Sequence, residues 1–398
     1  MPKNSWSELY PYWFLLLVIG FGWFVLAPLV PALSKTLNAN IDQILLLISL
    51  YGYTMVIFGL LAGWLTARFT VKAVLYIAAI LAVIGFIGRA LASDYILYFV
   101  MVLIGAIAYP LAMAPVGSIS ESLFKERSHT VVGISVGILF FGMALGAFFA
   151  PALYNAIGLS GISWLLVLLS IIAALWIMYV VKDYPTYYKG KSLKGTFKIG
   201  MIKNWYIGLA IASMSVMFGG IASTVLKLNN FSEASALTYA GLFGGLAFLG
   251  SAIGAMLLPP IFEAKKALKL GLIVTSILAF ISIVVMSFSL AYTNLVALIA
   301  LGYFFFGFFG NAFWSMALTS TTAYVDDPAK AGFSTSMYSV MTNLGVAIIP
   351  VLIGPLFSSQ STIASAIIIV LIIELIAVIL APTLKTSNES SNKRKKTR

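Results

Sequence analysis

Long apolar stretches alternate with short polar breaks along almost the whole chain. A helix that spans the hydrocarbon core of a bilayer needs about 20 mainly apolar residues. Stretches of that kind predict twelve membrane-spanning helices, and the short alternating segments of a transmembrane β-barrel are not seen. The predicted spans are 12–34, 43–66, 72–91, 94–117, 131–155, 162–182, 204–228, 236–260, 267–288, 292–320, 331–357 and 360–381.

The longest polar break lies halfway along the chain, at residues 183–203. It is basic and separates the sixth span from the seventh. We therefore expect an N-terminal six-helix bundle over 1–182, a cytoplasmic linker over 183–203 and a C-terminal six-helix bundle over 204–381. The polar, basic stretch 382–398 can bury little apolar surface, and we expect it to be a disordered cytoplasmic tail.

The two halves carry a repeated pattern. The stretch GISVGILFFGMALGAFFAP (133–151) aligns with GFSTSMYSVMTNLGVAIIP (332–350) at a constant offset of 199, with Gly, Leu, Gly and Pro in matching places. Small residues recur in many membrane helices, which is the simpler explanation. Matches in corresponding spans favour duplication, and two parallel six-helix halves are a transporter architecture.

Composition supports a membrane protein and narrows its chemistry. The chain is 61% hydrophobic and 9% charged, with a mean hydropathy of +1.05, whereas soluble domains are about a quarter charged. No cysteine is present, so thiol chemistry is excluded. With both termini in the cytoplasm, nearly all Lys and Arg fall in cytoplasmic segments. The net charge of +12 thus suggests contact with anionic lipid rather than with nucleic acid.

The stretch GWLTARFTVK follows the second predicted span and resembles the loop motif between helices two and three of the major facilitator superfamily. Gly63, Leu65, Arg68 and Lys72 match that motif, while Ala67 replaces its usual Asp. The stretch ERSHTVVGISVGILFFGMALGAFFAPAL resembles the family's helix 4–5 loop and glycine-rich fifth helix. The resemblance implies a twelve-helix major facilitator fold and a secondary transporter that works by rocker-switch alternating access in the cell membrane.

The resemblance also implies a cytoplasmic gate. Gly59 and Gly63 lie on one helical face, where another helix can approach closely, and in the family that neighbour is the eleventh helix. Since Ala67 has no carboxylate, we expect Asp326 or Asp327 to pair with Arg68; solvated loop charges are the alternative. Asp327 precedes a proline and is predicted to cap the eleventh helix. The gate residues are Gly59, Gly63, Arg68, Lys72, Asp326 and Asp327.

In the family, spans one, four, seven and ten line a central cavity, with two, five, eight and eleven beside it. Polar, aromatic or Met side chains near the middle of these spans are therefore substrate candidates, although aromatic and Met residues commonly serve packing. Buried amides need partners, which a cavity or a helix–helix hydrogen bond would supply. The candidates are Trp23, Tyr51, Tyr109, Met113, Met217, Asn311, Trp314 and Asn343.

The sequence has no Arg, Lys, Asp or Glu near the middle of these spans, which favours a neutral or amphipathic small-molecule substrate. Glu374, in the last span, is a candidate for proton coupling or pairs with a neighbour. Arg89 is expected to pair with Asp94 at the outer end of the third span, and His129 to lie at the surface.

A monomer without cofactor, metal or enzymatic activity is expected. The absence of a phosphate-binding loop argues against an ATP-driven pump. A proton-coupled exporter of hydrophobic compounds and a non-transporting sensor or scaffold are the alternative functions.

Overall fold

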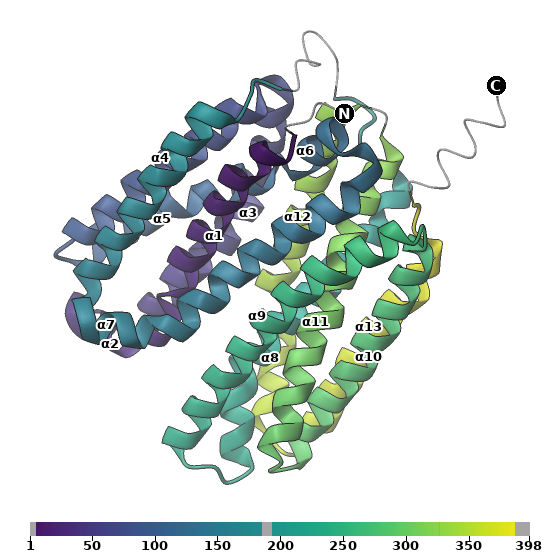
Figure 1. Ribbon diagram of the computed structural model, residues 1–398. Helices are drawn as coiled ribbons and strands as arrows, with labels where there is room; N and C mark the ends of the chain where they lie inside the picture. The colour runs from purple at the N-terminus through teal and green to yellow at the C-terminus, as the bar shows by residue number, and fades with distance from the viewer. Residues whose placement is uncertain (1–4, 185–192, 326, 387–398) are drawn as a thin grey trace. The chain divides into compact units, whose positions relative to one another are not determined.

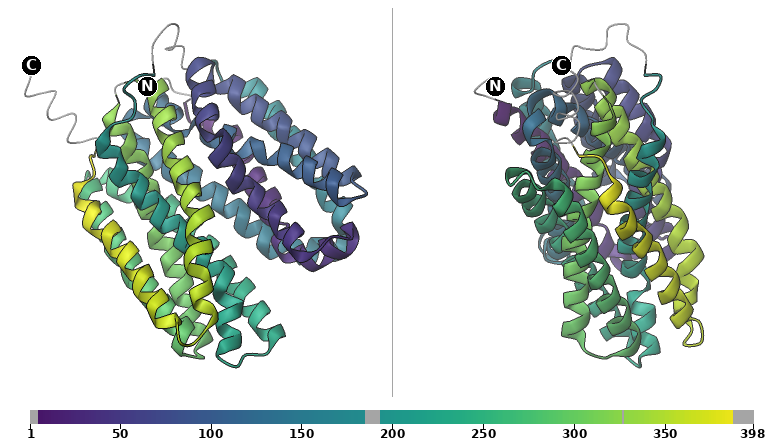
Figure 2. Two further views of the ribbon diagram at one scale, coloured as in Figure 1. Left: turned by 180° about the vertical axis from the view of Figure 1, so that it is seen from behind. Right: turned by 90° about the vertical axis from the view of Figure 1, so that its right-hand side faces the viewer.

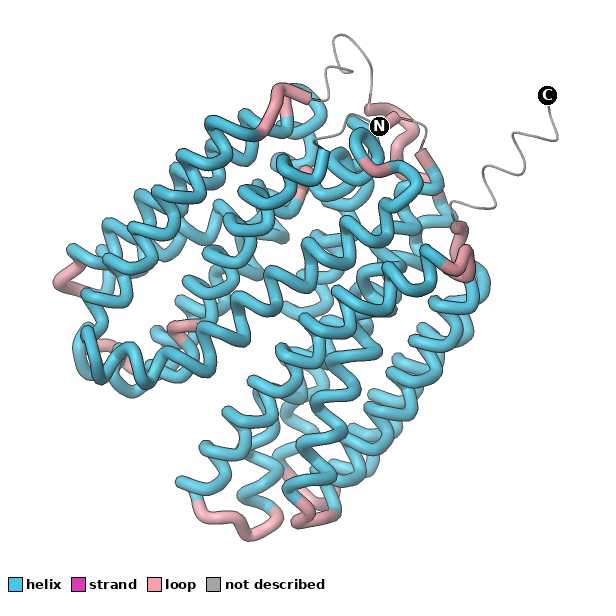
Figure 3. Tube along the Cα trace, viewed as in Figure 1, coloured by secondary structure: helices cyan, strands magenta, loops and turns pink. Residues whose placement is uncertain are grey.

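The computed structural model describes residues 5–184, 193–325 and 327–386. Within those ranges almost every residue lies in a helix, and no strand occurs (Figure 3). The α-helices labelled in Figure 1 are α1 (Leu9–Phe24), α2 (Val30–Leu37), α3 (Ile41–Arg68), α4 (Val71–Leu91), α5 (Tyr95–Met113), α6 (Val116–Leu123), α7 (Ser128–Val180), α8 (Ile202–Leu228), α9 (Glu233–Ala264), α10 (Leu268–Tyr292), α11 (Val296–Ser320), α12 (Pro328–Ile353) and α13 (Ile363–Leu380).

Eleven helical segments in the described ranges are long and apolar enough to cross a membrane. One of them, Lys125–Val180, has 56 residues, more than twice the length that a bilayer requires. It is broken at Gly158, whose φ of +68° and ψ of 179° are not helical and suit a residue without Cβ. The segment therefore contains two spans, as the sequence predicts, and the protein is a twelve-helix, multi-pass membrane protein.

Two predicted spans are less regular than the hydropathy pattern indicates. The first is interrupted after α1 by a turn and a short 3₁₀ helix (Ala27–Leu29), and α2 follows. The fourth divides into α5 and α6 around Pro115. Proline lacks a backbone N–H and clashes with the preceding turn, so Pro28 and Pro115 break the helical hydrogen-bond ladder while the hydropathy stays high.

The helices group into two compact units. Unit 1 contains Met1–Ser128, Ile138–Thr196 and Val325–Val340, and unit 2 contains His129–Gly137, Phe197–Tyr324 and Met341–Arg398. The long ranges follow the sequence halves, whereas two short segments do not. His129–Gly137, at the start of α7, belongs to unit 2, and Val325–Val340, which contains the first half of α12, belongs to unit 1. We call these the exchanged segments.

Glycines allow helix backbones to meet within each unit. In unit 1, a Cβ at Gly85 of α4 would lie 2.6 Å from the Cα of Gly105 in α5. In unit 2, a Cβ at Gly254 of α9 would overlap the backbone of Phe308 in α11, 2.6 Å from its carbonyl carbon. Such contacts are typical of membrane helices, whose association depends on close packing because the lipid is as apolar as the side chains. Figure 2 shows the same helices from two further sides.

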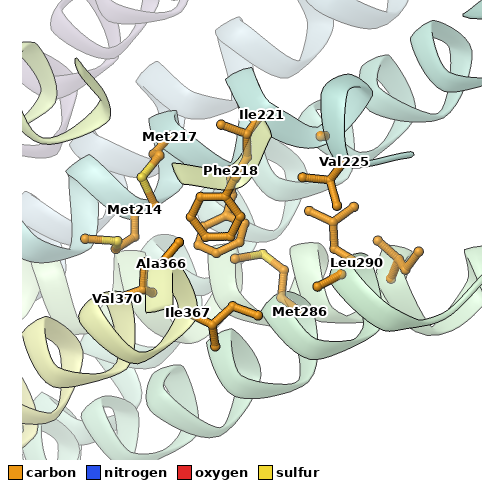
Figure 4. Packing of buried hydrophobic residues seen from close by; sticks show 14 of the residues in the cluster. Met214, Met217, Phe218, Ile221, Val225, Met286, Leu290, Ala366, Ile367 and Val370 are labelled. Carbon is orange, nitrogen blue, oxygen red and sulfur yellow. The ribbon is translucent and has the colours of Figure 1, made fainter. Parts of the chain in front are cut away.

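The apolar core of unit 2 is formed mainly by α8, α10, α11 and α13. Met217 and Phe218 of α8 pack with Met286 of α10 and Ile367 of α13 (Figure 4). The hydroxyl of Tyr303 in α11 donates to the carbonyl of Phe218 over 2.7 Å, which satisfies the one polar atom that this ring brings into the core. Dense packing thus fixes the positions of α8, α10, α11 and α13 relative to one another.

Candidate functional site

Three predicted substrate residues from different helices of unit 1 form one aromatic cluster. The ring of Trp23 in α1 stacks on Tyr51 in α3, with centroids 4.7 Å apart and planes at 8°. Tyr109 in α5 tilts against Trp23 at 5.2 Å. The indole Nε1 donates to the carbonyl of Ile48 over 2.8 Å, which fixes the orientation of the indole ring. Trp23, Tyr51 and Tyr109 are hereafter the aromatic cluster.

The surroundings of the aromatic cluster are closely packed. Tyr51, Tyr109 and Met113 are buried, while Trp23 keeps part of its surface accessible. Met113 lies one helical turn after Tyr109, as the sequence predicts, at the end of α5. A partly accessible indole held by buried rings provides an apolar surface for recognition. Its role in substrate binding stays a prediction.

Arg89 of α4 is the residue near this cluster that sequence reasoning did not assign to it. Its side chain is 3% exposed and does not pair with Asp94, whose carboxylate instead accepts the N–H of Leu97 and caps α5. Arg89 Nη1 donates to the carbonyl of Gly22 over 2.9 Å, and Nε donates to the Tyr98 hydroxyl over 3.3 Å. The expected ion pair at the outer end of the third span is therefore wrong.

In unit 2 the predicted substrate residues take part in helix contacts. Met217 lies inside the apolar core. Asn311 of α11 donates to Ser251 Oγ of α9 over 2.6 Å, which is the helix–helix alternative left open by the sequence. Trp314 donates to Thr342 Oγ1 over 3.3 Å, and Asn343 is buried. The substrate role of these four residues stays a prediction.

The exchanged segment Val325–Val340 packs on α3 and α6 within unit 1. A Cβ at Gly63 of α3 would lie 2.6 Å from Ser336 Oγ, and one at Gly59 would lie 2.6 Å from Val340 Cγ2. A Cβ at Gly117 of α6 would lie 2.6 Å from the carbonyl oxygen of Ala331. Gly59 and Gly63 therefore contact the eleventh predicted span, as expected, while their role in a gate stays a prediction.

The exchanged segment His129–Gly137 shows the corresponding arrangement within unit 2. A Cβ at Gly133 would lie 2.5 Å from the carbonyl oxygen of Ala255 in α9. Gly133 and Gly332 are equivalent in the sequence repeat, and Gly332 packs in the same way on Ser118 of α6. The repeat therefore corresponds to two equivalent packing contacts, one in each unit.

A carboxylate holds the start of α7. Glu263, near the end of α9, accepts the backbone N–H of His129 over 2.9 Å and that of Thr130 over 2.7 Å. A negative charge at a helix N-terminus satisfies free N–H groups and the helix dipole. His129 is buried here, so its expected surface position is wrong.

The start of α12 is capped by its own chain. Asp327 Oδ1 accepts the N–H of Ala329 over 2.9 Å, which confirms the predicted cap before Pro328. Arg68 is exposed and Lys72 is half-buried at the neighbouring turn. Asp326 lies outside the described residues. A pair between Arg68 and one of these aspartates stays a prediction.

Glu374 is buried near the middle of α13, and its Oε1 has no hydrogen-bond partner in the described part of the chain. The expected pairing with a neighbour is therefore not seen for this oxygen. Tyr206 of α8 interacts electrostatically with Glu374, but its hydroxyl donates to the carbonyl of Ile373 over 2.9 Å. A buried carboxyl of this kind is a candidate for proton binding.

The sequence and the fold are similar to those of known transporters. The family model of the Major Facilitator Superfamily matches residues 12–303 and 211–398. The transporter FucP in an outward conformation has a TM-score of 0.72 at 16% identity, covering 96% of this chain and 100% of FucP. The human organic anion transporter MFSD10 (TETRAN) has a TM-score of 0.73 at 14% identity, with the same coverage.

One curated relative extends the comparison. The cyanate transport protein CynX of Escherichia coli (strain K12) is 23% identical over 256 residues, which are 62% of this chain and 65% of that protein. The alignment thus spans slightly less than two thirds of the relative. Together with the twelve spans and the exchanged segments, the family match identifies the protein: it belongs to the major facilitator superfamily of transporters.

Proposed function

We propose that the protein is a secondary transporter that moves a small solute by rocker-switch alternating access. The observation that carries this proposal is the pair of exchanged segments. Each exchanged segment belongs by sequence to one half of the chain but packs on helices of the other half. If the halves move relative to each other, His129–Gly137 must separate from α9, and Val325–Val340 must separate from α3 and α6. Breaking and remaking a closed packing contact is what a two-state transporter requires.

The aromatic cluster is the proposed substrate-recognition element. Its rings and the half-exposed indole of Trp23 suit a neutral or amphipathic solute, which binds through apolar contact and a few hydrogen bonds. Arg89, beside the cluster, favours a second candidate, a small anion. The names of two similar proteins, a cyanate transport protein and an organic anion transporter, describe anionic substrates of those proteins and support this candidate.

Transport is tested in proteoliposomes that contain a pH-sensitive dye and are challenged with pools of sugars, peptides, organic anions and lipophilic cations. We expect saturable uptake from one pool. Trp23→Ala removes the ring that joins Tyr51 to Tyr109, and we expect it to raise KM or lower the uptake rate about tenfold or more, as for truncated aromatic anchors.

The matched control is Trp164→Ala, because Trp164 is an exposed tryptophan of unit 1 outside the cluster. Equal uptake by Trp23→Ala and Trp164→Ala would remove the cluster from the binding site. If folded protein took up no solute from any pool, the sensor or scaffold function would be favoured.

Coupling is read in the same assay. If the protein is a proton-coupled exporter, substrate movement changes the dye signal, and Glu374→Gln, which keeps the shape but cannot ionise, abolishes that change. Uptake without any pH change would support a uniporter. In that case Glu374 serves only packing.

The remaining elements of the proposal concern the setting in the membrane. We propose a monomer in the cell membrane with both termini in the cytoplasm and anionic lipid at the basic cytoplasmic face. The halves that rock are residues 1–182 and 204–381, joined by 183–203. Part of that linker, 185–192, and the tail beyond residue 386 lie outside the described residues.

A further inference from the structure

Arg89 is a buried cation whose charge no neighbouring carboxylate balances. Its described contacts are neutral: the carbonyl of Gly22, the hydroxyls of Tyr98 and Tyr51, and the rings of Phe86 and Tyr98. The two ring centroids lie 5.3 and 5.7 Å from the guanidinium carbon. Within residues 5–184, 193–325 and 327–386, it forms no ion pair. Guanidinium stays protonated in proteins, so this part of unit 1 carries one uncompensated positive charge.

One nitrogen of the guanidinium has no hydrogen-bond partner in the described part of the chain. This nitrogen, Nη2, is buried, although Nε and Nη1 both donate. A buried charge without a partner is strongly unfavourable, by several kcal/mol, and buried N–H donors are normally satisfied. The aromatic rings offset part of this through cation–π contact but leave the in-plane donors of Nη2 unused.

The guanidinium of Arg89 is connected to the aromatic cluster through Gly22 and Trp23. Arg89 holds the carbonyl of Gly22, and the next residue is Trp23, whose ring stacks on Tyr51. The Arg89 charge also acts directly on the Tyr51 hydroxyl. An anion bound to Arg89 would therefore act on both Trp23 and Tyr51.

The residues around the guanidinium are closely packed. A Cβ at Gly22 would lie 2.6 Å from Phe86 Cε1, so α1 and α4 are in close contact at this level, and Tyr51, Phe86 and Tyr98 are fully buried. A ligand with one negative charge would balance Arg89, whereas a divalent anion would leave an excess negative charge. The planar donor edge of arginine suits two acceptor oxygens at carboxylate or nitrate spacing.

We propose that Arg89, with Tyr51 and Trp23 beside it, forms a binding subsite for a small monovalent oxyanion or carboxylate. This inference rests on the proposed transport function and specifies its substrate class, in place of the neutral solute that the sequence favours. Arg89 supplies the charge and the planar donors, Tyr51 a further hydroxyl, and Trp23 the apolar wall.

The subsite is tested by calorimetric titration of the purified full-length protein in a HEPES buffer without added carboxylate or nitrate. Sodium nitrate and sodium formate are the probes, and sodium sulfate and glycerol are the comparisons. We expect saturable binding of nitrate or formate and none of sulfate or glycerol. Arg89→Gln should weaken binding about 10- to 100-fold, the range for a lost hydrogen bond to a charged group. Arg89→Lys keeps the charge but not the planar edge, and should bind with intermediate affinity.

Two controls keep the result interpretable. Lys35→Gln removes an exposed cation from α2 in the same unit and should bind nitrate like the wild type. Tyr51→Phe removes only a hydroxyl, so it tests the subsite even if Arg89→Gln does not fold; we expect weaker binding of the same probe. Equal binding by all variants, or no binding by a monodisperse, helical wild-type sample, would overturn the proposal.

The same samples separate this inference from the proposed function. Anion binding that depends on Arg89, without flux in proteoliposomes, would contradict transport and keep the subsite. Saturable flux of a neutral solute, without any binding of nitrate or formate, would keep transport and overturn the subsite.

Discussion

Gly254→Val is expected to prevent correct folding of unit 2. Gly254 of α9 faces the backbone of α11, where a Cβ would lie 2.8 Å from the Cα of Phe308 and overlap its carbonyl oxygen. The obstacle is main chain, so no side-chain rotation can relieve it, and the two helices must separate. Overpacking a core by a few methyl groups typically costs 1–3 kcal/mol, and we expect about 3 kcal/mol or more here. The measurement is thermal stability and monodispersity in detergent.

Gly244→Val is the matched control for this prediction. Gly244 lies on the same helix, but a Cβ there would have no atom within 4 Å. We therefore expect near wild-type stability, because valine is well tolerated in a membrane-spanning helix. If both variants were equally stable, the close approach of α9 and α11 would be disproved.

Gly117→Val is expected to abolish transport while leaving a stable protein. A side chain at Gly117 would press on the carbonyl oxygen of Ala331 and on Thr335 Oγ1, both at 2.6 Å, and would push the exchanged segment away from α6. The hydrogen bond from Ser118 Oγ to the carbonyl of Pro328, 2.9 Å long, would be lost with it. The state that contains this contact would lose about 1–3 kcal/mol, which shifts its population about 5- to 150-fold.

The measurement for Gly117→Val is initial uptake rate beside thermal stability. Alternating access needs both states, so strong depletion of one lowers turnover, while the helices of each sequence half keep their packing with one another. Gly241→Val, at an exposed glycine of α9 with no atom within 4 Å of a Cβ, controls for added bulk. Normal uptake by Gly117→Val would show that the contact of the exchanged segment with α6 does not limit transport.

The helices could be predicted from the sequence because hydropathy alone determines which stretches suit a bilayer. The predicted edges of α8 to α13 lie within a few residues of the observed ones. The break at Gly158 was also expected, since a polar and small-residue stretch separates two apolar runs there. The division of the first span at Pro28 was not, because apolarity continues through the turn and only the missing N–H groups of proline end the helix.

The candidate site was predicted in part. Trp23, Tyr51 and Tyr109 were chosen as separate mid-span residues, and their stacking depends on tertiary packing that hydropathy does not encode. Arg89 was misplaced because its position near the end of α4 suggested an interfacial ion pair. Its burial follows from Gly22, whose missing side chain lets Phe86 and Arg89 approach α1. Glu263 was overlooked because its partner is the backbone of a helix more than a hundred residues earlier.

The central claim, that the exchanged segments leave their partners during transport, is tested most directly by labelling a single cysteine at Ser336. The natural chain has no cysteine, so Ser336→Cys provides a unique thiol at a buried position against Gly63. A membrane-impermeant thiol reagent is applied to inside-out vesicles, with and without the transported pool.

Alternating access predicts that Ser336→Cys reacts to completion, faster when the pool is added, while Ala78→Cys in the core of unit 1 stays unreacted. If Ser336→Cys stayed as unreactive as Ala78→Cys in vesicles that transport, the segment would never leave α3, and the account would be contradicted.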